Sequence, residues 1–326
     1  MNTTNERSII VTGGSGFIGS NVCKTLVASG FNVINIDKRK RDIDGVTQYP
    51  FEVDNKQVLG ILKLLQPDAV IHIAADNSVP FSIKNPNQTY TQNVQQTISL
   101  LNNCLDANIK NFIFASSSSV YGHSVNADGS FVEGDPLAPV NPYGRSKQMC
   151  EAIIQDYASA FDISYANLRL FNVAGSANGK FGYQKDPLVH VLPIIAQKAL
   201  QDEEFEIFGN DYPTPDGTAV RDYTHVADVS RAFLSAEYYL LDGNKSVTLN
   251  IGNNNPVSID QLVSMVESAS STTIKRVYKP QRPGDMVSTH ANIQNASRTL
   301  GWEPSFSTQD IIVDELKWQK TKLKRK

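Results

Sequence analysis

The stretch Ile9-Ile10-Val11-Thr12-Gly13-Gly14-Ser15-Gly16-Phe17-Ile18-Gly19 decides the fold of this chain. Its first residues are apolar or β-branched and predict a short buried strand, and the glycines lead from that strand into a predicted helix. Gly13 permits a tight turn, Gly16 lets a pyrophosphate approach the backbone, and Gly19 lets the helix pack closely on the strand. The amides and partial positive charge of the helix N-terminus favour an anion. The stretch therefore predicts a strand–turn–helix unit that binds a dinucleotide.

An acidic residue follows this glycine loop at the end of the next predicted strand. Asp37 lies 18 residues beyond Gly19, where a carboxylate can accept both ribose hydroxyls of an adenosine. The same carboxylate would repel a 2′-phosphate, so NAD is predicted as the cofactor. The basic run from Lys38 to Arg41 could tolerate that phosphate, and it leaves NADP open as the alternative.

The first half of the chain alternates short apolar runs with amphipathic stretches. This pattern is typical of parallel strands joined by crossover helices. Strands are expected at 8–12, 32–36, 48–52, 69–73, 111–115 and 164–168, and helices at 17–29, 56–65, 87–106 and 143–161. The prediction is an α/β fold with a doubly wound parallel (Rossmann) sheet, which binds ligands at the carboxyl ends of its strands.

The composition of the sequence changes near residue 174. Glycine, proline, asparagine and aspartate become frequent, as in 209–217, and such loops suggest a ligand-facing lobe. We expect residues 1–175 to form an NAD-binding domain, to which 222–244 return. Residues 176–221 and 245–326 are expected to form a smaller, interleaved α/β lobe that binds the substrate.

Composition excludes several classes of protein. Of the 326 residues, 40% are hydrophobic and 19% are charged, the balance of an ordinary globular chain, and no apolar run approaches the length of a membrane span. The net charge is −3 although the last ten residues carry six positive charges, so the body is acidic and nucleic acid is not an expected partner. Three widely spaced cysteines form no metal-binding pattern, which predicts no metal and a reducing, cytoplasmic location.

Three polar side chains predict the chemistry. Tyr143 and Lys147 lie four residues apart on a predicted helix, and therefore on one face. A phenol has a pKa near 10, so it acts as a base near neutrality only if its pKa falls, and a cation about 4 Å away can lower it. Ser117 follows the predicted strand at 111–115, at the edge where the nicotinamide should lie. We therefore predict Tyr143 as the base, Lys147 as its activating cation and Ser117 as a hydroxyl that holds the reacting oxygen.

With these motifs in place, the chain resembles the extended short-chain dehydrogenase/reductase family, and within it the nucleotide-sugar 4-epimerases. The glycine loop, the Ser117, Tyr143 and Lys147 set and Leu168-Arg169-Leu170-Phe171-Asn172 are shared widely in that family. The run 207–226, which reads IFGNDYPTPDGTAVRDYTHV, is more specific to the epimerases. The resemblance covers nearly the whole chain. It implies reversible epimerisation at C4 of a UDP-hexose through a transient 4-keto sugar, with bound NAD.

The resemblance implies a full set of site residues, some of which the motifs above already predict. On the cofactor side it implies Gly13, Gly16, Phe17, Ile18, Gly19, Asp37, Lys38, Asp54, Asn55, Ala74, Ala75, Asn93, Tyr143, Lys147 and Phe171. On the substrate side it implies Ser117, Tyr143, Asn172, His190, Phe208, Arg221, Arg282, Asp285 and Thr289. Two arginines facing a diphosphate make physical sense, because a guanidinium binds phosphate oxygens bidentately. The resemblance also implies a homodimer formed through the helices at 87–106 and 143–161.

Some positions depart from the family pattern, and two other functions stay open. Asn77 stands where some epimerases have a lysine. Thr289 stands where some have a tyrosine, and the small residue implies room for N-acetylated sugars. One alternative is a nucleotide-sugar dehydratase or decarboxylase, although the run 117–120 lacks the acid those enzymes carry beside the catalytic hydroxyl. The other is an NAD-sensing scaffold without catalytic activity, against which the intact Ser117, Tyr143 and Lys147 set argues.

Overall fold

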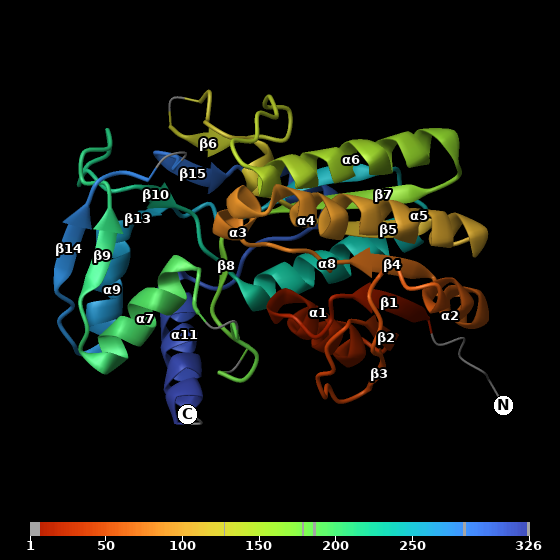
Figure 1. Cartoon of the computed structure of the whole chain (residues 1–326), viewed down its shortest axis with the longest axis horizontal. Coiled ribbons are helices and arrows are strands. Elements are labelled where there is room, and N and C mark those ends of the chain that lie inside the picture. The colour runs from red at the N-terminus through yellow and green to blue at the C-terminus, as the bar shows by residue number, and fades with distance from the viewer. Residues whose placement is uncertain (1–6, 127, 178, 185–186, 283–284, 325–326) are drawn as a thin grey trace.

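A seven-stranded parallel sheet forms the centre of the molecule (Figure 1). The structure, a computed structural model, describes residues 7–126, 128–177, 179–184, 187–282 and 285–324. The strand order is β12-β7-β5-β4-β1-β2-β3, which confirms the predicted doubly wound parallel sheet. The strands are β1 (Ser8–Thr12), β2 (Asn32–Ile36), β3 (Val46–Tyr49), β4 (Ala69–His72), β5 (Asn111–Ser117), β7 (Ser164–Leu170) and β12 (Val247–Ile251).

Helices cover both faces of this sheet, which explains why its strands read as continuous apolar runs. One face packs against α1 (Phe17–Ala28) and α8 (Val226–Leu241), and the other against α2 (Gln57–Leu65), α5 (Gln96–Asp106) and α6 (Pro142–Ala160). Each face has its own core cluster of buried apolar side chains. Among the described residues, no helix is long and apolar enough to cross a membrane.

One local expectation was wrong. The strand expected at 48–52 is β3, which begins at Val46 and ends at Tyr49, so 51–53 are left to line a cavity. The helix expected at 87–106 is present as one continuous helical segment, made of α4 (Pro86–Tyr90), a π-helical turn at Thr91–Gln95 and α5. A π turn widens the helix by one residue, and such turns occur often at functional sites. It buries Asn93 and Val94 together, which an unbroken α-helix with one apolar stripe would not predict.

The smaller lobe has a separate apolar core. Helices α7 (Val191–Gln201), α9 (Ile259–Ser270) and α11 (Thr308–Leu323) pack around it with the parallel pair β9 (Phe205–Phe208) and β14 (Arg276–Lys279). Figure 1 shows these elements together at one end of the large sheet. The helix α3 (Val79–Lys84), the 3₁₀ turn η2 (Ser118–Val120) and the helix α10 (Gln294–Leu300) complete the larger elements.

The two parts interleave more than the expected boundaries allow. Strand β12, expected in the lobe, forms the edge of the large sheet beside β7, where its Leu249 and Ile251 are buried. Conversely, β6 (Ser130–Phe131), expected in the first domain, joins the sheet β13-β10-β15-β6 with β10 (Val220–Arg221), β13 (Val257–Ser258) and β15 (Ser288–Ala291). A further pair joins β8 (Val173–Ala174) to β11 (Thr224–His225). These crossings place both parts of the chain around one site.

Candidate active site

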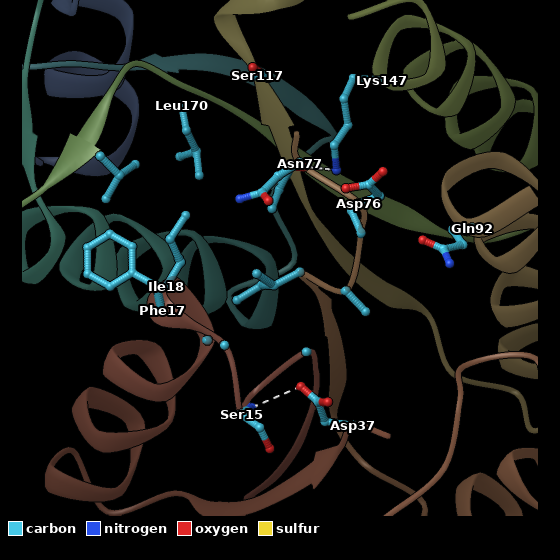
Figure 2. A pocket seen from close by; sticks show the side chains of 18 of the residues that line it. Ser15, Phe17, Ile18, Asp37, Asp76, Asn77, Gln92, Ser117, Lys147 and Leu170 are labelled. Carbon is cyan, nitrogen blue, oxygen red and sulfur yellow. Dashed lines mark hydrogen bonds between the residues drawn. The ribbon is translucent and has the colours of Figure 1, made fainter. Parts of the chain in front are cut away.

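A cavity of about 530 Å³ lies at the carboxyl edge of the large sheet. The glycine loop and Asp37 lie at one end of it, and Ser117 and Lys147 lie at the other (Figure 2). Of the predicted residues, it is lined by Gly13, Gly16, Phe17, Ile18, Gly19, Asp37, Lys38, Ala74, Ala75, Ser117, Tyr143, Lys147, Asn172 and His190. The topology thus brings residues from β1, β4, β5 and α6 to one edge, as a doubly wound sheet predicts.

The glycine loop is shaped to receive a phosphate group. Gly13 has φ +78°, and a Cβ there would lie 2.6 Å from the amide nitrogen of Ala74. A Cβ on Gly19 would lie 2.2 Å from the carbonyl oxygen of Gly13. Helix α1 has no acidic side chain in its first turn and no side-chain cap at Gly16, so the amides of that turn remain available to an anion. The donor set therefore fits the pyrophosphate of a dinucleotide.

A single methyl group in this loop should weaken cofactor binding. We expect Gly13→Ala to raise the Kd for NADH at least tenfold, because the left-handed backbone and the contact with Ala74 both oppose a Cβ. The measurement is fluorescence titration with NADH. Gly60→Ala is the matched control, because a Cβ at Gly60 inside α2 meets nothing within 4 Å. That variant should leave the affinity unchanged and should raise the free energy of unfolding by about 0.5–1 kcal/mol.

Asp37 is held where it can meet a ribose. Its carboxylate accepts hydrogen bonds from the amides of Ser15 at 3.1 Å and Arg39 at 2.9 Å, and each oxygen keeps a further lone pair. Part of the basic run after it is neutralised by acids. Lys38 pairs with Glu52 at 3.2 Å, and the guanidinium of Arg39 lies 3.8 Å from the carboxylate of Asp37 itself. Arg41 donates to the hydroxyl of Ser20 at 2.9 Å and lies over the ring of Phe181. The carboxylate of Asp37 favours a ribose with free hydroxyls over one that carries a 2′-phosphate.

Tyr143, Ser117 and Lys147 meet at the other end of the cavity. Asn141 caps α6 by accepting from the amide of Gly144, and Pro142 begins the helix, so Tyr143 lies in its first turn. Ser117 forms a side-chain hydrogen bond with Tyr143 that lowers the pKa of the phenol. Lys147 lies one turn further along α6 and donates to the carbonyl oxygen of Ala115 at 2.7 Å. The catalytic set is therefore assembled from one helix and one strand end.

The pKa values differ from the expectation for the base. Burial raises the pKa of Tyr143 above its usual value, and the negative charge of Asp76 raises it further. Burial also lowers the pKa of Lys147 to about 8. The nearby Cys150 and Glu151 raise this pKa, but by less than burial lowers it. The expectation that Lys147 by itself makes Tyr143 a base near neutrality is thus not met by the protein alone. The desolvation of the phenol outweighs the hydrogen bond with Ser117 that lowers its pKa.

Four expected cofactor residues lie outside the lining of the cavity. Asn93 is buried in the π turn, where it accepts from the amide of Asp76 and donates to its carbonyl oxygen, so it holds the loop that follows β4. Asn55 accepts from the amide of Gln57 at the start of α2, and Asp54 follows the lining residue Val53. The ring of Phe171 is fully buried against Tyr121 and Phe131, although Leu170 and Asn172 on either side of it line the cavity, so its role as a cofactor residue stays a prediction.

The expected substrate residues fall into three groups. Asn172 and His190 line the cavity, and the ring of His190 packs edge-on against Tyr183, with centroids 4.6 Å apart. Arg282 places its guanidinium over the ring of Phe208, 3.5 Å from the centroid, and accepts at its carbonyl from the amide of Asp285. Arg221 and Thr289 are register partners on β10 and β15.

Five of the expected substrate residues do not line the cavity described above, namely Phe208, Arg221, Arg282, Asp285 and Thr289. Thr289 is 2% exposed. The room for N-acetylated sugars that the small side chain of Thr289 implies therefore stays a prediction.

The sequence did not single out several residues that line the cavity. Tyr183 and Gln184 come from the loop before α7, and Asp76 follows directly after Ala75 at the end of β4. Asp76 could have been predicted from its position just beyond a strand end. Tyr183 and Gln184 lie far along the chain from any motif, so the sequence gives no comparable indication for them. Among the described residues, no group of three or more His, Cys, Asp or Glu side chains is arranged to hold a metal ion.

Comparison with known proteins identifies the family. The model of the NAD dependent epimerase/dehydratase family matches residues 9–252. A UDP-glucose 4-epimerase of Rhizobium meliloti is 35% identical over 322 residues, which cover 96% of this chain and 97% of that protein. The crystal structure of a UDP-glucose-4-epimerase from Stenotrophomonas maltophila, with bound NAD and formylated UDP-arabinopyranose, superposes with a TM-score of 0.94 at 31% identity, covering 98% of this chain and 100% of that one. The UDP-Glc/GlcNAc 4-epimerase of Campylobacter jejuni gives 0.84 at 28% identity over 97% and 99% of the two chains. The chain belongs to the NAD dependent epimerase/dehydratase family.

Proposed function

We propose that this protein is an NAD-dependent UDP-glucose 4-epimerase. The observation that carries the proposal is the meeting of Ser117, Tyr143 and Lys147 in the cavity that also contains the glycine loop and Asp37. Relatives with the name UDP-glucose 4-epimerase match along nearly the whole chain, which supports the same activity here.

Different residues of the chain bind the cofactor and transfer the proton. The amides of the first turn of α1 hold the pyrophosphate of NAD, and Asp37 holds the adenosine ribose. When bound, NAD supplies a hydride acceptor that later returns the hydride. Tyr143 takes the proton of the 4-hydroxyl group, and Ser117 holds that oxygen through its hydroxyl. Lys147, fixed by Ala115, supplies the positive charge that favours the phenolate.

The substrate is held at its nucleotide end. The family resemblance supports Arg221 and Arg282 as the residues that bind the diphosphate, and Phe208, Asn172 and Asp285 as those on the uridine side. Of these, Asn172 lines the cavity and the other four lie beyond its lining. Anchoring the nucleotide while leaving the sugar with few contacts lets the 4-keto sugar turn about its diphosphate link and present its other face. The epimer is then formed without net oxidation.

Product analysis tests the proposal directly. Purified protein is incubated with UDP-galactose, without added reductant, and the sugar nucleotides are separated by chromatography. The expected result is an equilibrium mixture of UDP-galactose and UDP-glucose. A parallel incubation with UDP-N-acetylgalactosamine tests the room for N-acetylated sugars. A 4-keto deoxy sugar or loss of carbon dioxide from UDP-glucuronate would instead indicate a dehydratase or a decarboxylase.

The pKa of Lys147 predicts an alkaline limit to activity. Its ammonium loses its proton near pH 8 in the folded chain, whereas the unfolded lysine keeps its proton up to pH 10.5. We therefore expect kcat/KM to fall as pH rises through about 8, because the cation that stabilises the phenolate is lost. In the same window the contribution of Lys147 to the free energy of unfolding should rise, since the unfolded chain binds more protons there.

Lys147→Arg separates this effect from other titrations. A guanidinium keeps its charge up to about pH 12, so the alkaline limb of the profile should move out of the measurable range in this variant. An unchanged limb near pH 8 in Lys147→Arg would assign the titration to another group.

We also infer that the protein forms a homodimer through α5 and α6. These helices lie side by side on one outer face of the molecule (Figure 1). Large apolar side chains are exposed on and beside that face, with Ile83 59%, Phe161 50% and Met149 42% exposed. Sedimentation analysis should give twice the mass of the chain, and Met149→Glu should shift the equilibrium towards monomer. A monomeric wild-type protein at micromolar concentration would contradict this assignment.

A further inference from the structure

A carboxylate that the proposed mechanism does not use lies at the catalytic end of the cavity. Asp76 lines the cavity, and Figure 2 shows it grouped with Asn77 and Lys147, at the opposite end from Ser15 and Asp37. Its Oδ1 accepts from the amide of Ser78 at 3.2 Å. Its Oδ2 is shielded from solvent and has no hydrogen-bond partner among the described residues.

The backbone of Asp76 is fixed from both sides. Asn93 accepts from its amide at 2.8 Å and donates to its carbonyl oxygen at 3.0 Å. The same amide group of Asn93 donates to Ser146 on α6 at 2.9 Å. The position of Asp76 is therefore tied to the helix that carries Tyr143 and Lys147.

A buried carboxylate oxygen without a donor is costly, so it indicates that a positively charged or donor group completes the site. The charge of Asp76 already acts on Tyr143 and Tyr183, whose pKa values it raises. It therefore opposes formation of the phenolate. A carboxylate that opposes the phenolate is expected at a catalytic centre only if its charge stabilises another group there.

We propose that Asp76 is the charge partner of the oxidised nicotinamide ring and makes the cavity prefer NAD⁺ to NADH. The inference rests on the proposed function, in which the hydride acceptor has to lie near Tyr143 and Ser117, because these side chains hold the oxygen on the carbon that is oxidised. The oxidised ring carries a positive charge that the reduced ring lacks. A fixed carboxylate beside it stabilises the oxidised form and leaves the affinity for the reduced form nearly unchanged. NAD is then held in the oxidised form that the next substrate requires.

Asp76→Asn tests the charge without changing the shape of the side chain. The Asn Oδ1 can still accept from Ser78, so the loop is retained. The ratio of Kd for NADH to Kd for NAD⁺ is measured by fluorescence titration and competition, on the full chain without sugar nucleotide. We expect this ratio to fall about tenfold in Asp76→Asn, through weaker binding of NAD⁺. Asp76→Glu, which restores the charge, should recover most of the wild-type ratio.

Glu52→Gln is the matched control, because Glu52 lines the same cavity in contact with Lys38, far from the catalytic end. Its substitution should change both affinities by the same factor. A ratio in Asp76→Asn that stays within twofold of the wild-type value would overturn the inference. Wild-type protein that binds neither form of the cofactor would instead overturn the proposed function, so the two failures are distinguishable.

Discussion

Tyr143→Phe should lower kcat by about three orders of magnitude and leave the KM for UDP-galactose within a few-fold of wild type. The substitution removes the oxygen that accepts the proton of the 4-hydroxyl group, and general base catalysis contributes factors of about 10²–10⁴. The nucleotide is held by other residues, so ground-state binding should change little. Initial rates in an assay coupled to UDP-glucose oxidation measure both constants.

Tyr157→Phe is the matched control for this variant. Tyr157 lies on the same helix, but its hydroxyl donates to Asn102 at 2.7 Å near the surface, away from the cavity. It should therefore retain wild-type turnover. If Tyr143→Phe also retained it, the proton acceptor would have to be another group, and the proposed mechanism would fail.

Glu151→Gln should lower the free energy of unfolding by about 3–5 kcal/mol, because it leaves a buried cation without its partner. Glu151 is 2% exposed and Arg169 is 4% exposed. Their side chains form hydrogen bonds of 2.7–3.0 Å through two guanidinium nitrogens. Burial lowers the pKa of Arg169, but Glu151 and Tyr121 raise it by more in the native protein. Without Glu151 the guanidinium still keeps its proton, because its intrinsic pKa is above 12, so an unpaired charge stays buried.

The measurement is urea denaturation of both single variants and the double variant. Glu151→Gln combined with Arg169→Met should lose less stability than the sum of the two single changes, since no unpaired charge remains. Asp162→Asn serves as a surface comparison, because Asp162 pairs with Lys110 where both side chains are exposed, and it should cost less than about 1 kcal/mol. Equal losses for the buried and the exposed pair would show that the buried pair is not needed for folding.

This ion pair also has a consequence for activity. Glu151 accepts a hydrogen bond from Ser116, the residue before Ser117, and lies one helical turn beyond Lys147. Ser116 and Arg169 are register partners on β5 and β7. The pair thus fixes the rotation of α6 over the strand end from which Ser117 projects, so loss of stability and loss of turnover should occur together in Glu151→Gln.

Features set by short-range spacing could be predicted from the sequence. The glycine loop specifies a strand, a turn and a helix within eleven residues, and its shape follows from local sterics at Gly13. The four-residue spacing of Tyr143 and Lys147 sets them on one face of α6, because the period of a helix is local. The doubly wound parallel sheet followed from the alternation of strands and helices, since parallel strands need crossover connections of one preferred hand.

Only the tertiary structure decided features that depend on distant partners. Whether Phe171 faces the cofactor or the core depends on Tyr121 and Phe131, and neither ring is near it in the chain. Asp76 becomes significant only because the π turn brings Asn93 against it and because Asn93 also bonds to Ser146 on α6. Hydrogen-bond partners and desolvation are set by packing between elements far apart in sequence, so the pKa of Tyr143 could not be predicted from the spacing of two side chains.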